Sequence, residues 1–438
     1  MDDSAAGAKN PEFQASESEN SVTRFGFSRD SSGQACLGGR PLRNILREAA
    51  VATPAYVYDL GGMRDRAERL GQAFGKARHL IAYAMKANSA GRVISTFRDV
   101  GTGIDAVSGG ELLLARRLEV PPQMIVFSGV AKTDAELDLA LQARIFSIQA
   151  ESPQEVSRIL ARAEEVGEHA RISLRINPAV EIDSHAHIST GHVRAKFGIP
   201  VSELGALSEQ LQTSRHGKLV GLSTHVGSML RTPEGYVASA KIVCEQARAL
   251  RERNLALEFL DFGGGFGIDY GGAPAVEPAE FAKAAVDLLK TQQLDDHLLV
   301  VEPGRSLVGP FGVLVASVVQ SKQSGDLTWL FIDAGMNDLM RPALYGARHR
   351  IEPLERIPGG REYQVAGPVC ESTDNFGSHA LGAQPGHVVL RDTGAYGFAM
   401  ANEYNARPLP SEIFTDDGQV VHVNPSRGVE AWIERRLG

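Results

Sequence analysis

The chain has 438 residues, of which 43% are hydrophobic and 22% are charged, and its formal net charge is −8. A chain of this length predicts about two or three domains with a large apolar core. The acidic balance argues against non-specific binding to nucleic acid or to an anionic membrane, and no apolar run approaches the roughly 18 residues of a membrane-spanning helix. We therefore expect a protein that handles small molecules, with neither nucleic acid nor membrane as a partner.

The three cysteines, Cys36, Cys244 and Cys370, lie far apart in the sequence. Their odd number and their spacing match neither a disulfide framework nor a zinc site, so we expect no metal and a reducing, cytoplasmic location. Residues 1–22 are rich in Ser, Ala, Glu and Asn and lack the apolar core of a secretory signal. We expect them to form a disordered tail outside the fold.

Short β-rich runs alternate with helical stretches between residues 56 and 308. This alternation is typical of a parallel sheet with crossover helices, and eight such strands indicate a closed (β/α)8 TIM-like barrel more than an open sheet. The predicted strands are residues 81–86, 103–107, 124–129, 145–150, 171–177, 219–226, 257–263 and 298–304.

Signals for the starts and ends of helices support this predicted alternation of strands and helices. Thr133 and Ser152 are each followed three residues later by a glutamate, which is the spacing of a capping box. Gly167 stands where a helix is expected to end, because glycine adopts the left-handed conformation of a helix stop at little cost.

Past residue 309 helical periodicity is scarce, and short β-rich runs are separated by Gly, Pro, Asn and Asp. Residues 309–438 are therefore predicted to form an all-β domain, Greek-key or sandwich-like in arrangement. Residues 23–55 precede the barrel and are expected to contribute to this β domain. The predicted fold class is thus α/β, with a barrel over residues 56–308 and a C-terminal β domain.

Lys86 closes the apolar strand 81–86 and is the first candidate for chemistry. An amine that is partly desolvated at a strand end has a lowered pKa, and the free amine adds to a carbonyl to give a Schiff base. Pyridoxal 5'-phosphate is the commonest carbonyl cofactor of this kind. The alternative is a structural lysine whose charged head reaches back to water.

The other candidates also lie at the ends of predicted strands. Active sites of (β/α)8 barrels lie on the loops after the carboxyl ends of the strands, so polar residues at these places favour a functional interpretation. They are Asp105, Ser128, Arg175, Asn177, His225, Ser228, Gly263, Gly264, Gly265, Glu302, Gly304 and Arg305.

Several of these positions suit the phosphate and the ring of pyridoxal phosphate. Consecutive glycines at residues 263–265 let backbone N–H groups surround a phosphate, although a tight turn explains them about as well. A carboxylate at Glu302 would keep the pyridine nitrogen protonated, which makes the ring a strong electron sink. His225 could stack on the ring, although a core or surface histidine is the usual case.

The chain contains, in order, YAMKANS (83–89), SGGE (108–111), HVGS (225–228), GGGFG (263–267) and EPGR (302–305). Together these motifs resemble those of the fold-type III pyridoxal-phosphate decarboxylases. The resemblance runs from about residue 54 to residue 414. It implies an N-terminal barrel, a C-terminal β domain and a head-to-tail homodimer with active sites at the interface.

The chain also contains ISTG (188–191), KFG (196–198), MNDLMRPALY (336–345), GPVCES (367–372) and GAYG (394–397). These motifs resemble those of the diaminopimelate decarboxylase family. The implied reaction is the pyridoxal-phosphate-dependent decarboxylation of meso-2,6-diaminopimelate to L-lysine and CO2, the last step of bacterial lysine biosynthesis. This amino-acid substrate keeps an amine and a carboxylate at the end that does not react, so the site must bind both.

The resemblance also implies a role for each site residue. Lys86 would hold the cofactor covalently, His225 would stack on its ring, and Glu302 would pair with its nitrogen. Cys370 of the second subunit would protonate the carbanion that CO2 leaves behind. The other residues expected around the cofactor are Asp105, Ser228, Gly263, Gly264, Gly265, Gly304, Arg305 and Tyr396, with Arg175 and Asn177 at its edge. The residues expected to bind the substrate are Arg305, Arg341, Tyr345, Glu371 and Tyr396.

Two alternatives stay open. A related fold-type III decarboxylase could act on ornithine, arginine, a siderophore intermediate or a carrier-bound amino acid, although paired arginines have no use for a substrate without a distal carboxylate. A catalytically inactive homologue is the other alternative, although Lys86, Glu302 and Cys370 are intact. The chain departs from the family after Ser372, where residues 373–376 (TDNF) replace a usual Gly-Asp pair and leave the geometry of that loop open.

Overall fold

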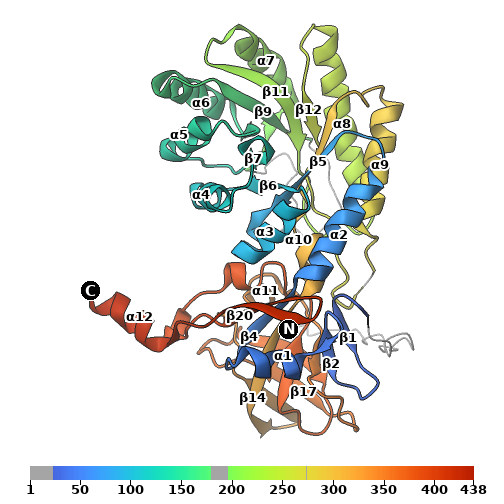
Figure 1. The fold of residues 1–438 in the computed structure, drawn as a ribbon, viewed down its shortest axis with the longest axis vertical. Coiled ribbons are helices and arrows are strands. Elements are labelled where there is room, and N and C mark those ends of the chain that lie inside the picture. Colours follow the sequence, from blue (N-terminus) through green and yellow to red (C-terminus); the bar gives the residue numbers. More distant parts are fainter. Residues whose placement is uncertain (1–22, 179–195, 273) are drawn as a thin grey trace, which may run out of the picture.

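The computed structural model describes residues 23–178, 196–272 and 274–438. Figure 1 shows two units, a barrel in its upper half and a β unit in its lower half. The predicted tail at residues 1–22 and the ISTG motif at residues 188–191 lie outside the described residues. Among the described residues, no helix combines the length and the apolar character needed to cross a membrane.

Eight parallel strands close into the predicted barrel. The ring runs β5-β6-β7-β8-β9-β11-β12-β13 and closes because β13 pairs with β5. The strands are β5 (His79–Ala84), β6 (Gly103–Ala106), β7 (Ile125–Phe127), β8 (Ser147–Ala150), β9 (Ala170–Asn177), β11 (Gly217–Thr224), β12 (Phe259–Asp261) and β13 (Leu298–Val301). The two-residue strand β10 (Ile199–Pro200) pairs with β9 outside the ring. The prediction of a closed (β/α)8 barrel is confirmed.

The side chains of the barrel strands change from apolar to polar along the strand direction. Side chains two residues apart on a strand point to the same face. Phe259 and Val300 belong to a buried apolar cluster, and each stands two residues before a buried acid, Asp261 or Glu302. This alternation brings acidic side chains to the carboxyl ends of β12 and β13.

Two of the barrel helices, α5 (Asp134–Ala143) and α6 (Pro153–Val166), begin at the predicted caps, and α6 ends at the predicted glycine. The other barrel helices are α2 (Leu60–Ala73), α3 (Gly91–Asp99), α4 (Gly109–Arg117), α7 (Leu204–Thr213), α8 (Glu234–Glu252), α9 (Pro278–Thr291) and α10 (Arg305–Val308). Thr133 and Glu136 form a complete capping box at α5, and the Ser152 side chain caps α6. Gly167 ends α6 with a φ of 71°, the left-handed conformation that glycine adopts at little cost.

The β unit is a nine-stranded sheet built from both ends of the chain. Its path is β18-β17-β15-β14-β4-β20-β21, and β19 pairs with both β14 and β16. The strands are β4 (Ala55–Asp59), β14 (Gly312–Ser324), β15 (Leu327–Ile332), β16 (Ile351–Pro353), β17 (Glu362–Ala366), β18 (Asn375–Ala380), β19 (His387–Leu390), β20 (Ser411–Asp416) and β21 (Gln419–Asn424). Because β4 pairs with β14 and β20, the chain crosses this sheet before it enters the barrel. The predicted domain limits stay predictions.

Residues 27–41 form a small sheet of their own and do not join the large one. It consists of β1 (Phe27–Arg29), β2 (Ala35–Leu37) and β3 (Arg40–Pro41), followed by α1 (Leu42–Ala49). Leu37 and Ile45 of this segment pack with Val313 and Ile413 of the β unit in one apolar cluster. The remaining helices are α11 (Arg341–Tyr345) and α12 (Gly428–Leu437), which extends away from the sheet in Figure 1 and was not predicted.

The β unit meets the barrel at the carboxyl ends of the barrel strands. The backbone N–H of Tyr396 donates to the carbonyl of Ala87 at 2.7 Å, and the Asn88 side chain donates to the carbonyl of Gly394 at 3.1 Å. A Cβ at Gly394 would lie 2.0 Å from the carbonyl oxygen of Val308, so only glycine allows this approach. The 394–396 loop therefore lies against the turn that carries Lys86.

Candidate active site

Lys86 lies in a single 3-10 turn, η2 (Met85–Ala87), directly after β5. Its Nζ donates a hydrogen bond to Oδ2 of Asp105 at 2.8 Å. Asp105 is completely buried on β6, and the hydroxyl of Ser128 donates to its other carboxylate oxygen. The side chain of Lys86 is 37% exposed. The amine is therefore held by a buried acid and remains reachable from solvent.

The predicted lowering of the pKa of Lys86 is wrong. Burial alone would lower it, but Asp105, Tyr396 and Glu302 together outweigh burial and raise the pKa above its ordinary value. The reason is that a carboxylate within hydrogen-bonding distance favours the charged amine. The amine of Lys86 is therefore held in its charged form by the neighbouring acids Asp105 and Glu302.

Glu302 belongs to a buried group of three polar side chains that the sequence pattern only partly revealed. The amide of Gln149 donates to Oδ2 of Asp261 at 2.7 Å and to Oε1 of Glu302 at 2.8 Å. Asp261 is completely buried, and its other oxygen accepts from the backbone N–H of Gly263 at 2.8 Å. Gln149 and Asp261 were not predicted. The available signal was that both are polar residues within strands that otherwise bury apolar side chains.

Both acids of this group hold their protons more tightly than usual. Burial, followed by the neighbouring acids Asp261 and Asp105, raises the pKa of Glu302 well above its ordinary range. Burial raises the pKa of Asp261 from 3.8 to about 6. Two carboxyl groups in one buried site cannot both ionise at low cost, so this pair retains a proton near neutral pH.

His225 follows β11 and is held as a neutral ring. Its Nδ1 accepts from the backbone N–H of Gly264 at 3.2 Å, which assigns the proton to Nε2. Burial lowers the pKa of His225 well below its ordinary value, and the charges of Arg175 and Lys86 add to the effect. Arg175 in turn is bound by Glu151 at 2.6 Å and donates to the His225 carbonyl at 3.4 Å. Asn177 ends β9, the strand that carries Arg175.

The Gly263–Gly265 loop lies where three barrel loops approach one another. Added Cβ atoms would lie 2.4 Å from the carbonyl oxygen of Thr224 at Gly263, and 2.0 Å from that of Glu302 at Gly264. Gly265, with a φ of 90°, would place a Cβ 2.2 Å from the Gly227 carbonyl oxygen. The loop is therefore closely packed, which only glycine permits. Packing alone explains these glycines, so their predicted contact with phosphate stays a prediction.

Gly304 and Arg305 connect the end of β13 to this region. A Cβ at Gly304 would lie 3.1 Å from the Cβ atoms of Ala84 and Ala87, on either side of Lys86. Arg305 donates to Ser228 at 3.0 Å, and its guanidinium lies 4.7 Å from the ring centre of Tyr396. Arg305 is 8% exposed and its Nε has no hydrogen-bond partner among the described residues.

Arg341 and Tyr345, at the two ends of α11, differ in exposure. Arg341 is 6% exposed and its guanidinium lies 4.5 Å from the ring centre of Tyr270. Tyr345 is 48% exposed. Arg341, Tyr345 and Tyr396 all belong to the electrostatic surroundings of Arg305. The structure thus gathers most of the predicted site residues at one mouth of the barrel.

Cys370 and Glu371 are exposed, and their described contacts lie within the β unit. The backbone N–H of Cys370 donates to the Asn405 side chain at 2.9 Å, and the Tyr404 hydroxyl donates to Glu371 at 2.5 Å. Within the part of the chain that the structure describes, no hydrogen bond or ion pair joins either residue to Lys86. The described contacts of Cys370 and Glu371 therefore tie them to the β unit, not to Lys86 of their own chain.

The loop that departs from the family pattern is closed by a buried acid. Asp374 is 4% exposed, and its two oxygens accept from the backbone N–H groups of Val369 and Met336, each at 2.7 Å. These bonds fix the turn that carries Cys370 and Glu371. The aspartate of the usual Gly-Asp pair is thus present in this chain and ties the loop together.

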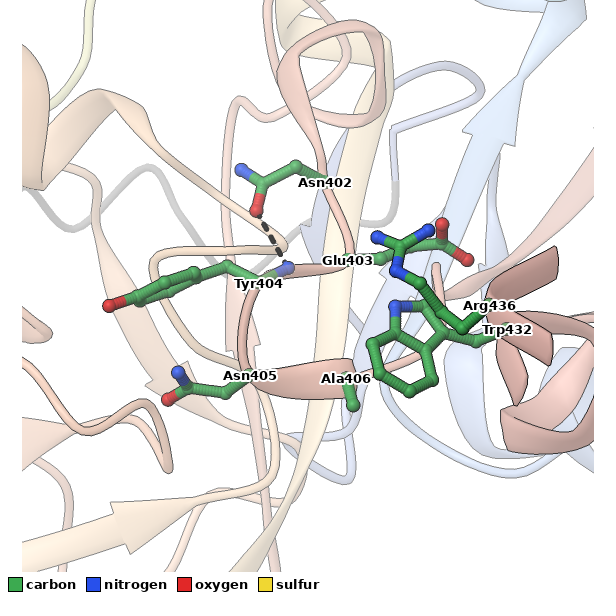
Figure 2. Close-up of a pocket in the computed structure, with 7 residues that line it drawn as sticks. All are labelled: Asn402, Glu403, Tyr404, Asn405, Ala406, Trp432 and Arg436. Atoms are coloured by element: carbon green, nitrogen blue, oxygen red, sulfur yellow. Dashed lines mark hydrogen bonds between the residues drawn. The ribbon is translucent and has the colours of Figure 1, made fainter.

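Figure 2 shows a surface cavity of about 650 Å³, and two of its lining residues, Tyr404 and Asn405, are those that contact Glu371 and Cys370. It is lined by Asn402, Glu403, Tyr404, Asn405, Ala406, Trp432 and Arg436. None of these was predicted as a site residue. The cavity holds no group suited to a carbonyl cofactor, so we place the chemistry at the barrel mouth, where the ionisable side chains converge.

The residues at the barrel mouth fit pyridoxal phosphate. A reachable lysine amine suits its aldehyde, and the proton-holding Asp261–Glu302 pair suits a ring nitrogen. The buried and partnerless Nε of Arg305 suits an anionic group, since an unsatisfied buried donor is costly. These features are those of a site for an anionic carbonyl compound.

Comparison with known proteins agrees with this chemistry. The family described as "Pyridoxal-dependent decarboxylase, pyridoxal binding domain" matches residues 60–309. The diaminopimelate decarboxylase of Aquifex aeolicus is 33% identical over 412 residues, which cover 92% of this chain and 96% of that protein. That of Vibrio cholerae is 36% identical over 393 residues, or 89% and 93% of the two chains.

Solved structures give the same result. The Helicobacter pylori diaminopimelate decarboxylase complexed with L-lysine superposes with a TM-score of 0.85 at 32% identity, over 91% of this chain and 100% of that chain. The M. jannaschii diaminopimelate decarboxylase in co-complex with L-lysine gives 0.88 at 30% identity, over 94% and 98%. The chain therefore belongs to the diaminopimelate decarboxylase family of pyridoxal-dependent decarboxylases.

Proposed function

We propose that this protein decarboxylates meso-2,6-diaminopimelate to L-lysine and CO2, with pyridoxal phosphate attached to Lys86. One observation carries the proposal. The solvent-reachable amine of Lys86 and the buried guanidinium of Arg305 lie at the same barrel mouth. The first suits the cofactor, and the second suits a carboxylate that the reaction leaves in place. The relatives named above carry the same activity in their names.

The cofactor, when bound, supplies an electron sink for the electrons left when CO2 departs. Glu302, supported by Asp261 and Gln149, would hold a proton at the pyridine nitrogen. Neutral His225 would lie against one face of the ring, where a charged imidazole would repel the cationic ring. The further cofactor contacts that we propose are Asp105, Ser228, Gly263, Gly264, Gly265, Gly304, Arg305 and Tyr396.

Arg305, Arg341 and Tyr345 would bind the carboxylate at the unreacted end of the substrate. Guanidinium groups bind carboxylates through paired, charge-assisted hydrogen bonds, which also fix direction. Tyr396 would lie between this end and the cofactor, and Glu371 would bind the distal ammonium. This arrangement holds the substrate so that only one of its two carboxylates reaches the ring.

Cys370 and Glu371 would act in the site of a second copy of the chain. Both are exposed on the β unit and contact a turn of their own chain there. A head-to-tail homodimer would carry them to the partner's barrel mouth, where the Cys370 thiol would protonate the reacting carbon. We propose such a homodimer, located in the cytoplasm.

The test is CO2 release from meso-diaminopimelate, ornithine, lysine and arginine by the purified protein. We expect release from meso-diaminopimelate alone, and none from a Lys86→Ala variant. A preference for ornithine or arginine would contradict the proposed binding of a distal carboxylate. It would favour instead the alternative of a related decarboxylase with another substrate.

A further inference from the structure

The buried arginines among the described residues fall into two kinds. Arg29 and Arg175 are 5% and 7% exposed and are bound by carboxylates, Glu352 at 2.7 Å and Glu151 at 2.6 Å. Arg305 and Arg341 are equally buried, at 8% and 6%. Among the described residues, neither of these two forms an ion pair with an acid.

Arg305 and Arg341 contact neutral side chains instead of acids. Arg305 donates to the hydroxyls of Tyr270 at 2.8 Å and of Ser228 at 3.0 Å. Arg341 lies 4.5 Å from the ring centre of Tyr270, whose ring is therefore shared by the two cations. Nη1 of Arg341 lies 2.6 Å from Nε2 of His349. Two buried cations without a counter-ion are costly, so the fold maintains a positive site that an anion from outside can fill.

His349 is oriented so that it can only accept from Arg341. Its Nδ1 lies 2.8 Å from the carbonyl oxygen of Arg391, so this nitrogen carries the proton and donates. Nε2 is then the acceptor for the Arg341 guanidinium. Burial, with the charge of Arg341 next, lowers the pKa of His349 to about 3. The histidine therefore binds Arg341 without neutralising it.

Tyr270 and His349 also contact each other. Their rings meet edge to face, with centres 5.0 Å apart and planes at 75°. Tyr270 lies on the loop after β12, and His349 lies eight residues beyond Arg341 on the loop after α11. The paired rings of Tyr270 and His349 thus link the barrel to the β unit. Together they contact the guanidinium groups of both arginines.

We propose that Tyr270 and His349 are positioning residues that hold Arg305 and Arg341 for the carboxylate at the unreacted end of the substrate. They thereby determine the preference for ligands that carry this carboxylate. The proposal rests on the proposed function, in which these two arginines bind that group. Replacing either neutral partner by an acid would pair the arginine internally and remove the preference.

The experiment compares two ligands of the holoenzyme that differ only in this carboxylate. L-Lysine carries it and cadaverine lacks it, and both are titrated by the change in cofactor absorbance. Tyr270→Phe removes the bond to Arg305, and His349→Phe removes the acceptor for Arg341. We expect each variant to bind lysine about tenfold more weakly, as for the loss of a hydrogen bond to a charged group. Cadaverine binding should stay unchanged.

Matched variants separate positioning from general damage. Tyr363→Phe removes another buried tyrosine bond of the β unit, to the carbonyl of Ala383, and should leave the lysine-to-cadaverine preference unchanged. His349→Gln keeps an acceptor and should retain most of the preference, which also provides a readout if His349→Phe does not fold. Equal weakening of both ligands, or weakening of neither, would overturn the proposal. A wild-type enzyme without any preference for lysine would instead contradict the proposed function.

Discussion

The amine of Lys86 and the carboxylate of Asp105 lie on neighbouring barrel strands and form a hydrogen bond of 2.8 Å. Of the groups that raise the pKa of Lys86, Asp105 has the largest effect. The carboxylate keeps the amine charged, whereas attack on the cofactor aldehyde requires the neutral amine. We therefore expect Asp105 to control how readily the cofactor-free protein captures its cofactor.

We expect Asp105→Asn to shift capture to lower pH. Without the carboxylate, burial dominates and lowers the pKa of Lys86, so the pH at half-maximal rate should fall by at least about one unit. The measurement is the rate of covalent attachment of pyridoxal phosphate to cofactor-free protein across pH. An unchanged pH profile would show that Asp105 does not set the protonation of Lys86.

The Asp261–Glu302 pair predicts a specific pH dependence of stability. An acid whose pKa is higher in the folded protein stabilises the fold below its unfolded value and loses that contribution as pH rises through its folded value. For Asp261 this window runs from 3.8 to about 6. Wild-type cofactor-free protein should therefore lose on the order of 3 kcal/mol of unfolding free energy across this window, relative to Asp261→Asn. Denaturant unfolding at several pH values measures it, and parallel curves for the two proteins would argue against the shared proton.

Cys370 is expected to be needed for turnover and not for folding. Its side chain is exposed, so Cys370→Ala should leave stability unchanged and lower kcat by about 100-fold or more, as for loss of a general acid. Cys244→Ala is the control, because Cys244 is buried in α8 and should affect stability more than kcat. Nearly normal turnover by Cys370→Ala would assign the proton to another group.

Shared active sites make a prediction for mixtures. Lys86→Ala and Cys370→Ala are each expected to be nearly inactive, but a hybrid dimer keeps one complete site. Unfolding and refolding the two variants together should therefore restore about a quarter of wild-type activity, since half of the dimers are hybrids with one working site each. No recovery in verified hybrids would place Cys370 in the site of its own subunit.

Tyr404 donates a hydrogen bond to Glu371 at 2.5 Å from the wall of the surface cavity in Figure 2. If Glu371 binds the distal ammonium, Tyr404→Phe should raise KM for meso-diaminopimelate about fivefold and leave kcat nearly unchanged. Glu403→Gln disturbs the same turn through its ion pair with Arg435 and should leave KM unchanged. Equal effects of the two variants would mean that the turn acts only structurally.

Features with a local cause were predictable from the sequence. The eight barrel strands, the Thr133 and Ser152 caps and the Gly167 helix stop depend on residues within a few positions of one another. The candidate residues at strand ends followed from the same periodicity, because the carboxyl ends of parallel strands meet at one mouth. Most of the residues that the structure gathers at the barrel mouth could therefore be named before the structure.

Features set by contacts between distant residues were not predictable. The pKa of Lys86 depends on Asp105 of the next strand, and the partnership of Gln149 with Glu302 spans most of the barrel. The place of β4 in the β unit depends on pairing with β14 and β20, far along the chain. Tyr270 and His349 carry no motif of their own, since their significance comes from which arginines they touch.

The attachment of the cofactor to Lys86 is the claim on which the account depends, and borohydride reduction followed by peptide mass spectrometry tests it most directly. The protein also contains a buried lysine, Lys132, which is bound by Glu155 and two backbone carbonyls and provides an internal control. We predict that the reduced cofactor is found on the peptide containing Lys86 and not on that containing Lys132. A protein that remains unmodified, or a label on any lysine other than Lys86, would contradict the account.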